Sequence, residues 1–267
     1  MDNLPPATWR LLRSSPADGA TNMALDEAIL RAVAAGLAPP TIRLYSWEPA
    51  CLSLGRAKPV TDVDLAALQT AGFGLVRRPT GGRAILHVDE LTYCIVAPQH
   101  EPRVAGTIVE SYRRLSAGLV RSLELLGVEH IAADRSADHR STGPVCFESP
   151  SDYEITVAGR KLVGSAQMRA QGTVLQHGTV PLYGDIARIC QFLAAHPDPA
   201  RVRGRAATVQ EILGRPVTWD EAAAAITAGL AAALNLRLEP GELTQDELAW
   251  TRELREQKYA APNWTQK

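Results

Sequence analysis

The sequence predicts an α+β fold, a mixed β-sheet with flanking helices and a small helical C-terminal end. Short runs of alternating apolar and polar residues, typical of strands, are interleaved with segments of helical periodicity. Capping-box patterns of the form Thr-x-x-Glu mark helix starts at Thr107, Thr208, Thr218 and Thr244. A chain of 267 residues can bury one substantial core. We therefore expect a single domain over 1–267, with its core at about 38–240 and a helical segment at 241–267.

Local signals along the chain predict the individual elements. A first helix is expected to begin at an N-cap, Thr21, and to end at Gly36, with Asp26 off its apolar face. The polar stretch 132–144 shows no periodicity and is expected to form a loop. A long helix from Thr107 should bury a stripe made of Ile108, Tyr112, Leu115, Leu119 and Leu126. The other expected elements are strands at Thr41–Tyr45, Cys51–Leu54, Gly74–Arg77, 83–86 and 91–96, the last two paired, a helix at 62–70, a hairpin at 153–167 and a strand at 173–182.

Composition excludes several classes of protein. The formal net charge of -1 gives no electrostatic footprint for nucleic acid. No stretch approaches the roughly 18 apolar residues of a membrane span, and the N-terminus lacks a signal-peptide pattern. The four cysteines are far apart and form no CxxC pair, which argues against a zinc site and a disulfide framework. We expect a cytoplasmic protein with reduced thiols, no metal, and neither a nucleic acid nor a membrane partner.

The loop Arg77-Arg-Pro-Thr-Gly-Gly-Arg83 joins two predicted strands. Paired glycines let the backbone come close to a ligand, and the flanking arginines and amides can hold a carbonyl or a phosphate. The loop lacks the Gly-Lys-Ser/Thr ending of a P-loop, and no Gly-x-Gly opens a helix after it. Taken alone, a Gly-Gly pair between strands is more often a simple turn.

Cys146 is the candidate nucleophile. It lies at a loop-to-strand junction beside a proline, whereas Cys51, Cys94 and Cys190 fall within apolar strand or helix patterns. Lys161 follows in the adjoining hairpin, and a nearby ammonium would lower the pKa of the thiol. The residues alone leave the alternatives open, because a lone cysteine is most often a small buried hydrophobe and a lysine on a strand face is usually solvated. His87 and His177 have no metal-binding spacing and are each expected to be a structural histidine.

Taken together, these motifs resemble the lipoate-protein ligase and octanoyltransferase family. The glycine loop with Ala-Ile-Leu-His87 after it resembles the signature loop of that family. The remaining matching segments, in the expected order, are 22–27, Trp47-Glu-Pro, 53–56, 155–166, 174–179, Lys258-Tyr259 and Trp264. The resemblance implies the catalytic-domain fold of biotin and lipoate protein ligases.

Within the family the chain is most similar to the octanoyltransferase branch that Gram-positive bacteria use. Arg83 stands where ATP-dependent ligases often carry a third glycine, and a cysteine precedes Phe147-Glu-Ser-Pro-Ser151. The resemblance implies that Cys146 forms an acyl-thioester and that Lys161 lowers its pKa and positions the acyl group. The substrate-binding residues that it implies are Arg78, Thr80, Gly81, Gly82, Arg83, His87, Gly164, Ser165, Ala166, His177 and Gly178.

The resemblance also implies partners. Octanoyl-acyl carrier protein would be the donor, and a lipoyl-carrier protein, the glycine cleavage H protein or a dehydrogenase E2 subunit, the acceptor. No cofactor and a monomer are expected. Val88-Asp89 after His87 departs from the His-Asp of many ligases, so no role is carried over to that aspartate. The alternatives are an ATP-dependent lipoate ligase, an octanoyl amidotransferase between carrier proteins, and a non-catalytic carrier-binding protein.

Overall fold

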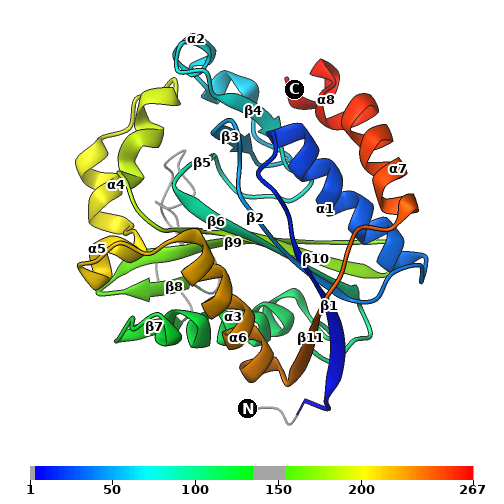
Figure 1. The fold of residues 1–267 in the computed structure, drawn as a ribbon. Helices are drawn as coiled ribbons and strands as arrows, with labels where there is room; N and C mark the ends of the chain where they lie inside the picture. Colours follow the sequence, from blue (N-terminus) through cyan, green and yellow to red (C-terminus); the bar gives the residue numbers. More distant parts are fainter. Residues whose placement is uncertain (1–3, 135–153, 267) are drawn as a thin grey trace.

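A computed structural model describes residues 4–134 and 154–266 (Figure 1). Its main sheet has eight strands in the order β11-β1-β2-β6-β10-β9-β8-β7. The pairs β11–β1 and β1–β2 are parallel, and every later pair is antiparallel. A second sheet has three strands in the order β4-β3-β5. The expected α+β fold with a mixed sheet is confirmed.

The elements have the following bounds. The strands are β1 (Ala7–Arg13), β2 (Thr41–Tyr45), β3 (Cys51–Leu54), β4 (Gly74–Arg77), β5 (Ile85–His87), β6 (Glu90–Pro98), β7 (Ile131–Asp134), β8 (Glu154–Val157), β9 (Arg160–Ala170), β10 (Thr173–Pro181) and β11 (Leu236–Pro240). The α-helices are α1 (Gly19–Ala34), α2 (Leu65–Thr70), α3 (Ile108–Leu125), α4 (Pro199–Arg205), α5 (Val209–Leu213), α6 (Trp219–Leu234), α7 (Gln245–Leu254) and α8 (Pro262–Thr265). Short 3₁₀ helices at Val60–Asp62 and Ile186–Phe192 and a π-helical turn at Arg255–Tyr259 complete the described chain.

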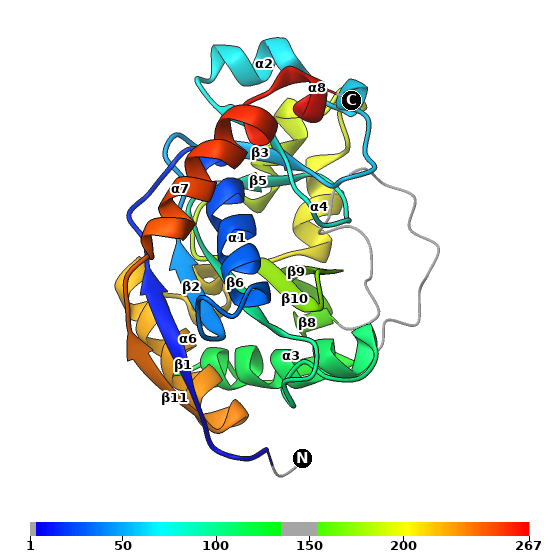
Figure 2. The ribbon, with the colours of Figure 1, turned by 90° about the vertical axis from the view of Figure 1, so that its right-hand side faces the viewer.

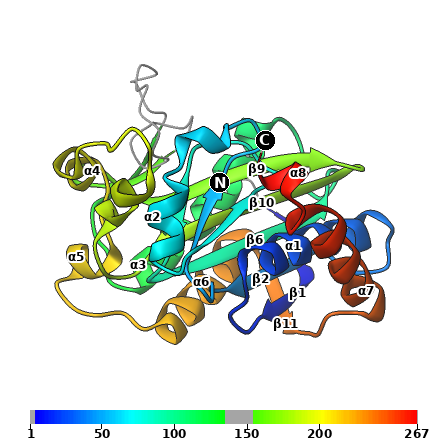
Figure 3. The same cartoon turned by 90° about the horizontal axis from the view of Figure 1, so that it is seen from above.

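Helices cover both faces of the main sheet (Figures 2 and 3). Helices α3 and α6 pack on one face, where Leu115, Leu119 and Leu123 project toward the sheet at intervals of four residues. Helix α1 lies on the other face, with α7 packed along it. Because α1 lies between the sheet and α7, nearly its whole circumference is buried. No helix in the described ranges is long and apolar enough to cross a membrane.

The two helices α3 and α6 cross at a pair of glycines. A Cβ added at Gly229 would lie 2.3 Å from the hydroxyl oxygen and 2.4 Å from the backbone nitrogen of Ser122. A Cβ added at Gly118 would lie 2.6 Å from a methyl carbon of Leu230. The Ser122 hydroxyl donates to the carbonyl of Gly118 within its own helix. The close approach of the two backbones therefore requires glycine at position 229, whereas at position 118 the added atom would mainly meet a leucine side chain.

The small sheet and the C-terminus are held together by Arg77. Its buried guanidinium donates to the carbonyl of Gly55 at the end of β3, at 3.0 Å, and to that of Lys58. It also donates to the carbonyls of Trp264 and Thr265 in α8, at 2.9 and 3.1 Å. The indole of Trp264 donates back to the carbonyl of Arg77. This arginine is thus fully engaged with backbone carbonyls of the protein, and α8 closes over β4.

Several sequence predictions are confirmed in detail. The strands Thr41–Tyr45, Cys51–Leu54 and Gly74–Arg77 have the expected bounds. The hairpin turn has positive φ at Ala158 and Gly159, as a two-residue turn between strands requires. Helices begin after all four predicted caps. The complete capping box forms only at Thr107 and Thr244, because Glu211 and Glu221 pair instead with Arg160 and Arg215.

Other predictions are wrong. The N-cap of α1 is Asp18, whose carboxylate accepts from the amide of Thr21. Strands β5 and β6 do not pair: β5 pairs with β3 in the small sheet, and β6 lies between β2 and β10 in the large one. Ile108 is 56% exposed and does not belong to the buried stripe of α3. Residues 131–134 form β7, so the loop expected from residue 132 is wrong there, and the rest of that stretch lies outside the described residues. The strands β1 and β11 were not predicted from the sequence.

Replacing Gly229 by alanine should destabilise the protein, although alanine is the better helix former by about 1 kcal/mol. The added methyl group would collide with the backbone of α3 and force the helices apart, which costs about 1–3 kcal/mol. Gly204 in α4 is the matched control, because a Cβ there meets nothing within 4 Å. Urea unfolding should show a lower free energy of unfolding for Gly229→Ala and an equal or higher one for Gly204→Ala. Equal effects of the two changes would contradict the described crossing.

Candidate active site

The glycine loop is held in place by the backbone of β3 and by its own arginine. The amide of Arg78 donates to the carbonyl of Leu54, and the amide of Arg56 donates to the carbonyl of Thr80. The buried guanidinium of Arg78 donates to the carbonyls of Gly81 and Arg83, at 3.2 and 2.8 Å, and so closes the loop on itself. The loop passes so near the end of β3 that a Cβ added at Gly55 would lie 2.0 Å from the carbonyl oxygen of Gly82.

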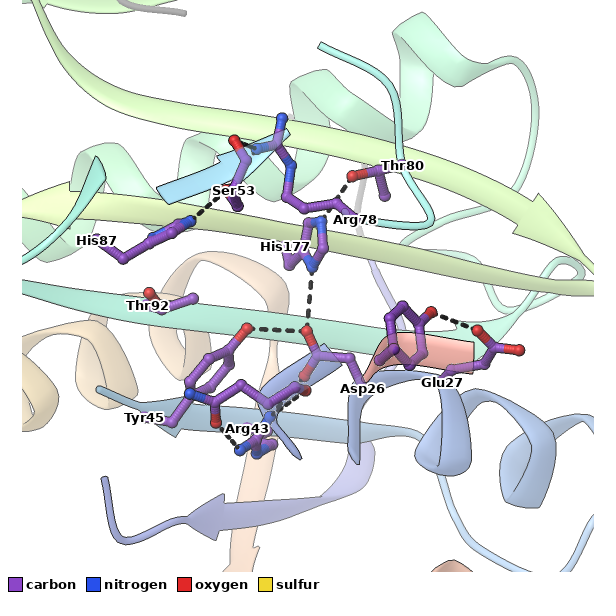
Figure 4. Close-up of polar contacts among 12 residues, drawn as sticks. Asp26, Glu27, Arg43, Tyr45, Ser53, Arg78, Thr80, His87, Thr92 and His177 are labelled. Carbon is purple, nitrogen blue, oxygen red and sulfur yellow. Dashed lines mark hydrogen bonds and ion pairs between the residues drawn. The ribbon is translucent and has the colours of Figure 1, made fainter. Parts of the chain in front are cut away.

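Behind the loop lies a carboxylate with no solvent exposure, that of Asp26 on α1 (Figure 4). One oxygen accepts from Arg43 on β2, at 2.7 Å. The other accepts from the hydroxyl of Tyr45, at 2.8 Å, and lies 3.0 Å from Nδ1 of His177 on β10. The other ring nitrogen of His177, Nε2, lies 2.7 Å from the hydroxyl oxygen of Thr80. Asp26 therefore connects the glycine loop to α1, β2 and β10.

Burial and the neighbouring charges together set the protonation of this network. Burial lowers the pKa of His177 below its usual 6.5, even though Asp26 favours the charged ring. Burial would raise the pKa of Asp26, but the bond from His177 and the charge of Arg43 outweigh it and keep that pKa below its usual value. Burial and the adjacent Asp26 raise the pKa of Tyr45 well above 10. Asp26 is thus ionised, Tyr45 is protonated, and a neutral His177 donates from Nδ1 to Asp26 and accepts from Thr80 at Nε2.

A second network surrounds His87 on β5. Its Nδ1 lies 2.8 Å from a carboxylate oxygen of Glu90, and its Nε2 lies 2.6 Å from the hydroxyl oxygen of Ser53. That hydroxyl also accepts from Arg78, at 2.6 Å. The indole of Trp47 stacks on the imidazole, with ring centroids 3.9 Å apart and planes 12° from parallel. Ser53 has no solvent exposure, so the arrangement orients the ring of His87 and does not present a serine nucleophile.

A narrow slot lies between the two networks. Its empty volume is about 380 Å³, open mouth included. Apolar side chains and closely packed glycine backbone make up most of its surface. The residues that line it are Met23, Tyr45, Trp47, Arg78, Gly82, Ile85, His87, Thr92, Gly164, Ser165, Ala166, His177, Gly178 and Thr179. The exposed Gly82 places the mouth of the slot at the glycine loop.

The structure brings most of the predicted substrate-binding residues together. Those that line the slot are Arg78, Gly82, His87, Gly164, Ser165, Ala166, His177 and Gly178. Thr80, Gly81 and Arg83 belong to the adjoining loop, and Thr80 contacts the ring of His177 from behind. The two histidines are structural in the expected sense, since both ring nitrogens of each are paired. Their roles toward a substrate stay predictions.

Lys161 differs from the expectation. It is 4% exposed, and its ammonium donates to Glu154 across the β8–β9 hairpin, at 2.8 Å. The reading of a solvated strand-face lysine is therefore wrong, because the strand face turns inward and a carboxylate compensates the charge. Lys161 does not line the slot. Cys146 lies outside the described residues.

Sequence reasoning missed the residues that organise the site. Asp26 was placed off the buried face of its helix, yet it has no exposure. Its partners Arg43 and Tyr45 and the acid Glu90 received no role. A functional role for the segment that contains Asp26 was indicated only by its family resemblance. One local signal was available. Asp26 lies in a helix that is apolar on its other face as well, and this pattern indicates a buried carboxylate.

The lipoyl protein ligase A/B catalytic domain model matches residues 18–231 of the chain. The chain belongs to this family. It is 44% identical to the octanoyltransferase LipM of Kyrpidia tusciae over 96% of its length and 98% of that protein. It is 38% identical to the octanoyltransferase LipM of Bacillus subtilis over 97% of its length and 98% of that protein. The predicted resemblance to the octanoyltransferase branch of the lipoyl ligase family is confirmed.

Solved structures of the lipoyl ligase family share the fold. A lipoate-protein ligase A bound with ATP superposes with a TM-score of 0.82 at 24% identity, over 97% of this chain and 99% of the other. The bi-partite lipoate protein ligase of Thermoplasma acidophilum gives 0.81 at 25% identity, over 97% and 96%. These likenesses show that the two sheets and flanking helices are the catalytic fold of lipoate ligases.

Replacing His177 by asparagine should reduce the loss of stability on mild acidification. The unfolded histidine takes up a proton near pH 6.5, whereas the buried one resists protonation. The unfolded state therefore binds more protons below pH 6.5, and the free energy of unfolding falls as the pH drops, by at most about 1.4 kcal/mol per pH unit from this group. Urea unfolding between pH 5 and 7 should show a shallower slope for His177→Asn.

The control for this measurement is the exposed His100. His100→Asn should leave the slope of the wild type unchanged. The pH range stays above the titration of Asp26, whose pKa is held low and whose stabilisation is lost only in stronger acid. An unchanged slope in His177→Asn would contradict a neutral buried imidazole.

Proposed function

We propose that this protein moves an octanoyl group from the thioester of an acyl carrier protein, through a thioester on Cys146, to the lysine of a lipoyl-carrier protein. The observation that carries the proposal is the apolar slot that opens at the glycine loop, in a chain whose relatives are octanoyltransferases. The acceptor would be the glycine cleavage H protein or a dehydrogenase E2 subunit. The reaction would require neither ATP nor another cofactor.

The slot suits a short unbranched acyl chain. Met23, Ile85 and the rings of Tyr45 and Trp47 supply apolar contact. Gly82 and the Gly164-Ser165 segment line the same slot, so backbone amides there would be the donors to the acyl carbonyl. Donors aimed at the carbonyl would stabilise the oxyanion that forms when it is attacked. The tail would thus lie among the apolar side chains, with the carbonyl toward the glycine loop.

The remaining cysteines support Cys146 as the nucleophile. Cys51 and Cys94 are buried in the strands β3 and β6, and burial raises the pKa of both thiols well above the usual value. A protonated buried thiol is a poor nucleophile. Cys190 is also buried, in the helical turn after β10. None of these three is therefore a plausible acyl carrier, and Cys146 is the remaining cysteine of the chain.

The two chemical steps balance without an energy source. The Cys146 thiolate attacks the thioester carbonyl, a new carbon–sulfur bond forms while the carbon–sulfur bond to the donor breaks, and the donor sulfur takes up the proton that Cys146 lost on ionising. The neutral amine of the acceptor lysine then attacks the new thioester, an amide forms as the bond to Cys146 breaks, the Cys146 thiolate is released, and the amine proton goes to solvent. The first step exchanges one thioester for another and is nearly isoenergetic. The second gives a more stable amide, which draws the reaction forward.

Lys161 would stabilise the thiolate. An ammonium near a thiol favours its ionised form. The pairing with Glu154 explains how a lysine with 4% exposure keeps its charge inside the hairpin. Lys161 would act through the part of its positive potential that Glu154 does not offset, and removing the lysine would also take away a partner of Glu154.

Incubating the protein with octanoyl-acyl carrier protein, without ATP, magnesium or acceptor, should give an octanoyl adduct on Cys146. Mass spectrometry of peptides would locate it, and hydroxylamine should release it. Cys146→Ala should abolish adduct and transfer, whereas Cys190→Ala should retain both. Lys161→Met should slow transfer at pH 7 about tenfold or more and recover at higher pH, because more of the thiol then ionises unaided.

A matched pair of variants separates the role of Lys161 from folding. Glu154→Gln with Lys161→Met removes both charges, so no uncompensated carboxylate remains in the hairpin. This double variant should keep the wild-type unfolding midpoint more closely than Lys161→Met, yet remain slow in transfer. A strict requirement for ATP, an adduct on another cysteine, or full activity of Cys146→Ala would each overturn the proposal.

A further inference from the structure

We propose that the turn after β3 binds the phosphodiester of the donor's phosphopantetheine arm, through the side chains of Arg56 and Lys58. The inference rests on the proposed function, in which an acyl carrier protein presents the octanoyl group as a thioester at the end of that arm. The phosphodiester joins the arm to the carrier protein and is the charged group of the arm. The site would therefore recognise a part of the donor that stays outside the acyl slot.

The turn lies beside the mouth of the slot. The amide of Arg56 donates to the carbonyl of Thr80 in the glycine loop, at 2.9 Å. Gly55, which precedes Arg56, approaches the carbonyl oxygen of Gly82 so closely that a Cβ there would collide with it. Arg56 is exposed and Lys58 is partly exposed. Both side chains thus extend from backbone that adjoins the mouth, where an arm leaving the slot would pass.

The backbone of the turn is fixed in place. The amide of Lys58 donates to the carbonyl of Gly55, at 3.0 Å, and the carbonyl of Lys58 accepts from the buried guanidinium of Arg77. Arg77 also donates to the carbonyl of Gly55 and to two carbonyls of α8. Binding a ligand therefore has to order only the side chains of Arg56 and Lys58, which keeps the entropic cost of binding low.

The two cations of the turn have no counter-charge in the described part of the chain. Neither side chain makes an ion pair or a hydrogen bond with another residue there. Exposed arginines elsewhere commonly pair with a carboxylate, as Arg203 does with Asp185. The two segments that meet at the mouth, 54–61 and 77–88, contain no aspartate or glutamate. The turn therefore presents positive charge that attracts an anionic group.

A phosphodiester matches this pair of side chains in charge and in hydrogen bonding. It carries one negative charge and two acceptor oxygens, which the forked guanidinium of Arg56 can bind together, with the ammonium of Lys58 as a second positive charge. The octanoyl chain is neutral, so the apolar slot cannot make such a contact. A charge-assisted hydrogen bond at this point should raise the affinity for the donor by a factor of about 10 or more.

Two small donors that differ only at the phosphate test the site. Octanoyl-phosphopantetheine carries a phosphate at the position of the phosphodiester, and octanoyl-pantetheine carries a hydroxyl there. With no nucleotide and no acceptor present, mass spectrometry measures the initial rate of adduct formation on Cys146 at donor concentrations below saturation. The wild type should react faster with the phosphorylated donor by a factor of about 10 or more.

The double variant Arg56→Gln with Lys58→Gln should lose this preference and keep the wild-type rate with octanoyl-pantetheine. With octanoyl-acyl carrier protein it should show a raised KM and an unchanged kcat, because the lost contact lies away from the reacting carbonyl. Arg252→Gln is the matched control. Arg252 is an exposed arginine on α7, which packs against α1, so this variant should keep the wild-type preference.

Other results would contradict the inference. Equal wild-type rates with the two small donors, or a preference that survives in the double variant, would overturn it. So would an equal loss of rate with both small donors, which would mean that the two residues act on the shape of the mouth. Acylation by the carrier protein but by neither small donor would place recognition on the carrier's surface and overturn it too. A wild type that forms no adduct with any donor overturns the proposed function as well.

Discussion

The ionised carboxylate of Asp26 is the constraint on which the site depends. A charge with no exposure costs several kcal/mol unless close partners compensate it. Arg43 and Tyr45 from β2 and His177 from β10 supply that compensation, so α1 and both strands must meet at one point. The other ring nitrogen of His177 is hydrogen-bonded to the hydroxyl of Thr80, and this bond fixes the glycine loop. The order of the central strands and the position of the loop are thus set by one buried group.

Many of the polar groups around the slot are paired with one another. Arg78 donates to Ser53 and to carbonyls of its own loop, and Glu90 accepts from the side chains of Thr92 and Thr179. These bonds hold the walls of the slot in place, and its surface is mostly apolar, which suits a hydrocarbon tail. The arginines of the loop look like anion ligands in the sequence. In the structure the bonds of Arg77 and Arg78 to neighbouring carbonyls give these two a structural role.

The sequence predicted elements whose signals are local. Alternation gave β2, β3 and β4, and threonine caps gave the starts of four helices. The sequence could not predict which strands pair. The strands β5 and β6 are close in the chain, but β5 pairs with β3 in the small sheet and β6 pairs with β10 in the large one. Nor could it predict the burial of Asp26 and Lys161, since each depends on a partner that only the fold supplies. Motif resemblance found eight of the slot residues, because they lie in contiguous segments, and missed Tyr45 of the slot and its neighbour Arg43, which lie on a separate strand.

Hydrogen exchange in Asp26→Asn tests most directly whether this carboxylate holds the site together. The amide keeps one acceptor oxygen, so its NH2 group would face either Arg43 or the Tyr45 hydroxyl and His177, where an acceptor is required. Backbone amides of residues 77–83 should then exchange faster, and more so than those at the α3–α6 crossing on the other face of the sheet. Asp64→Asn, which changes the cap of α2, should affect only its own helix. Unchanged exchange in the glycine loop, or an equal acceleration in every segment, would contradict the account.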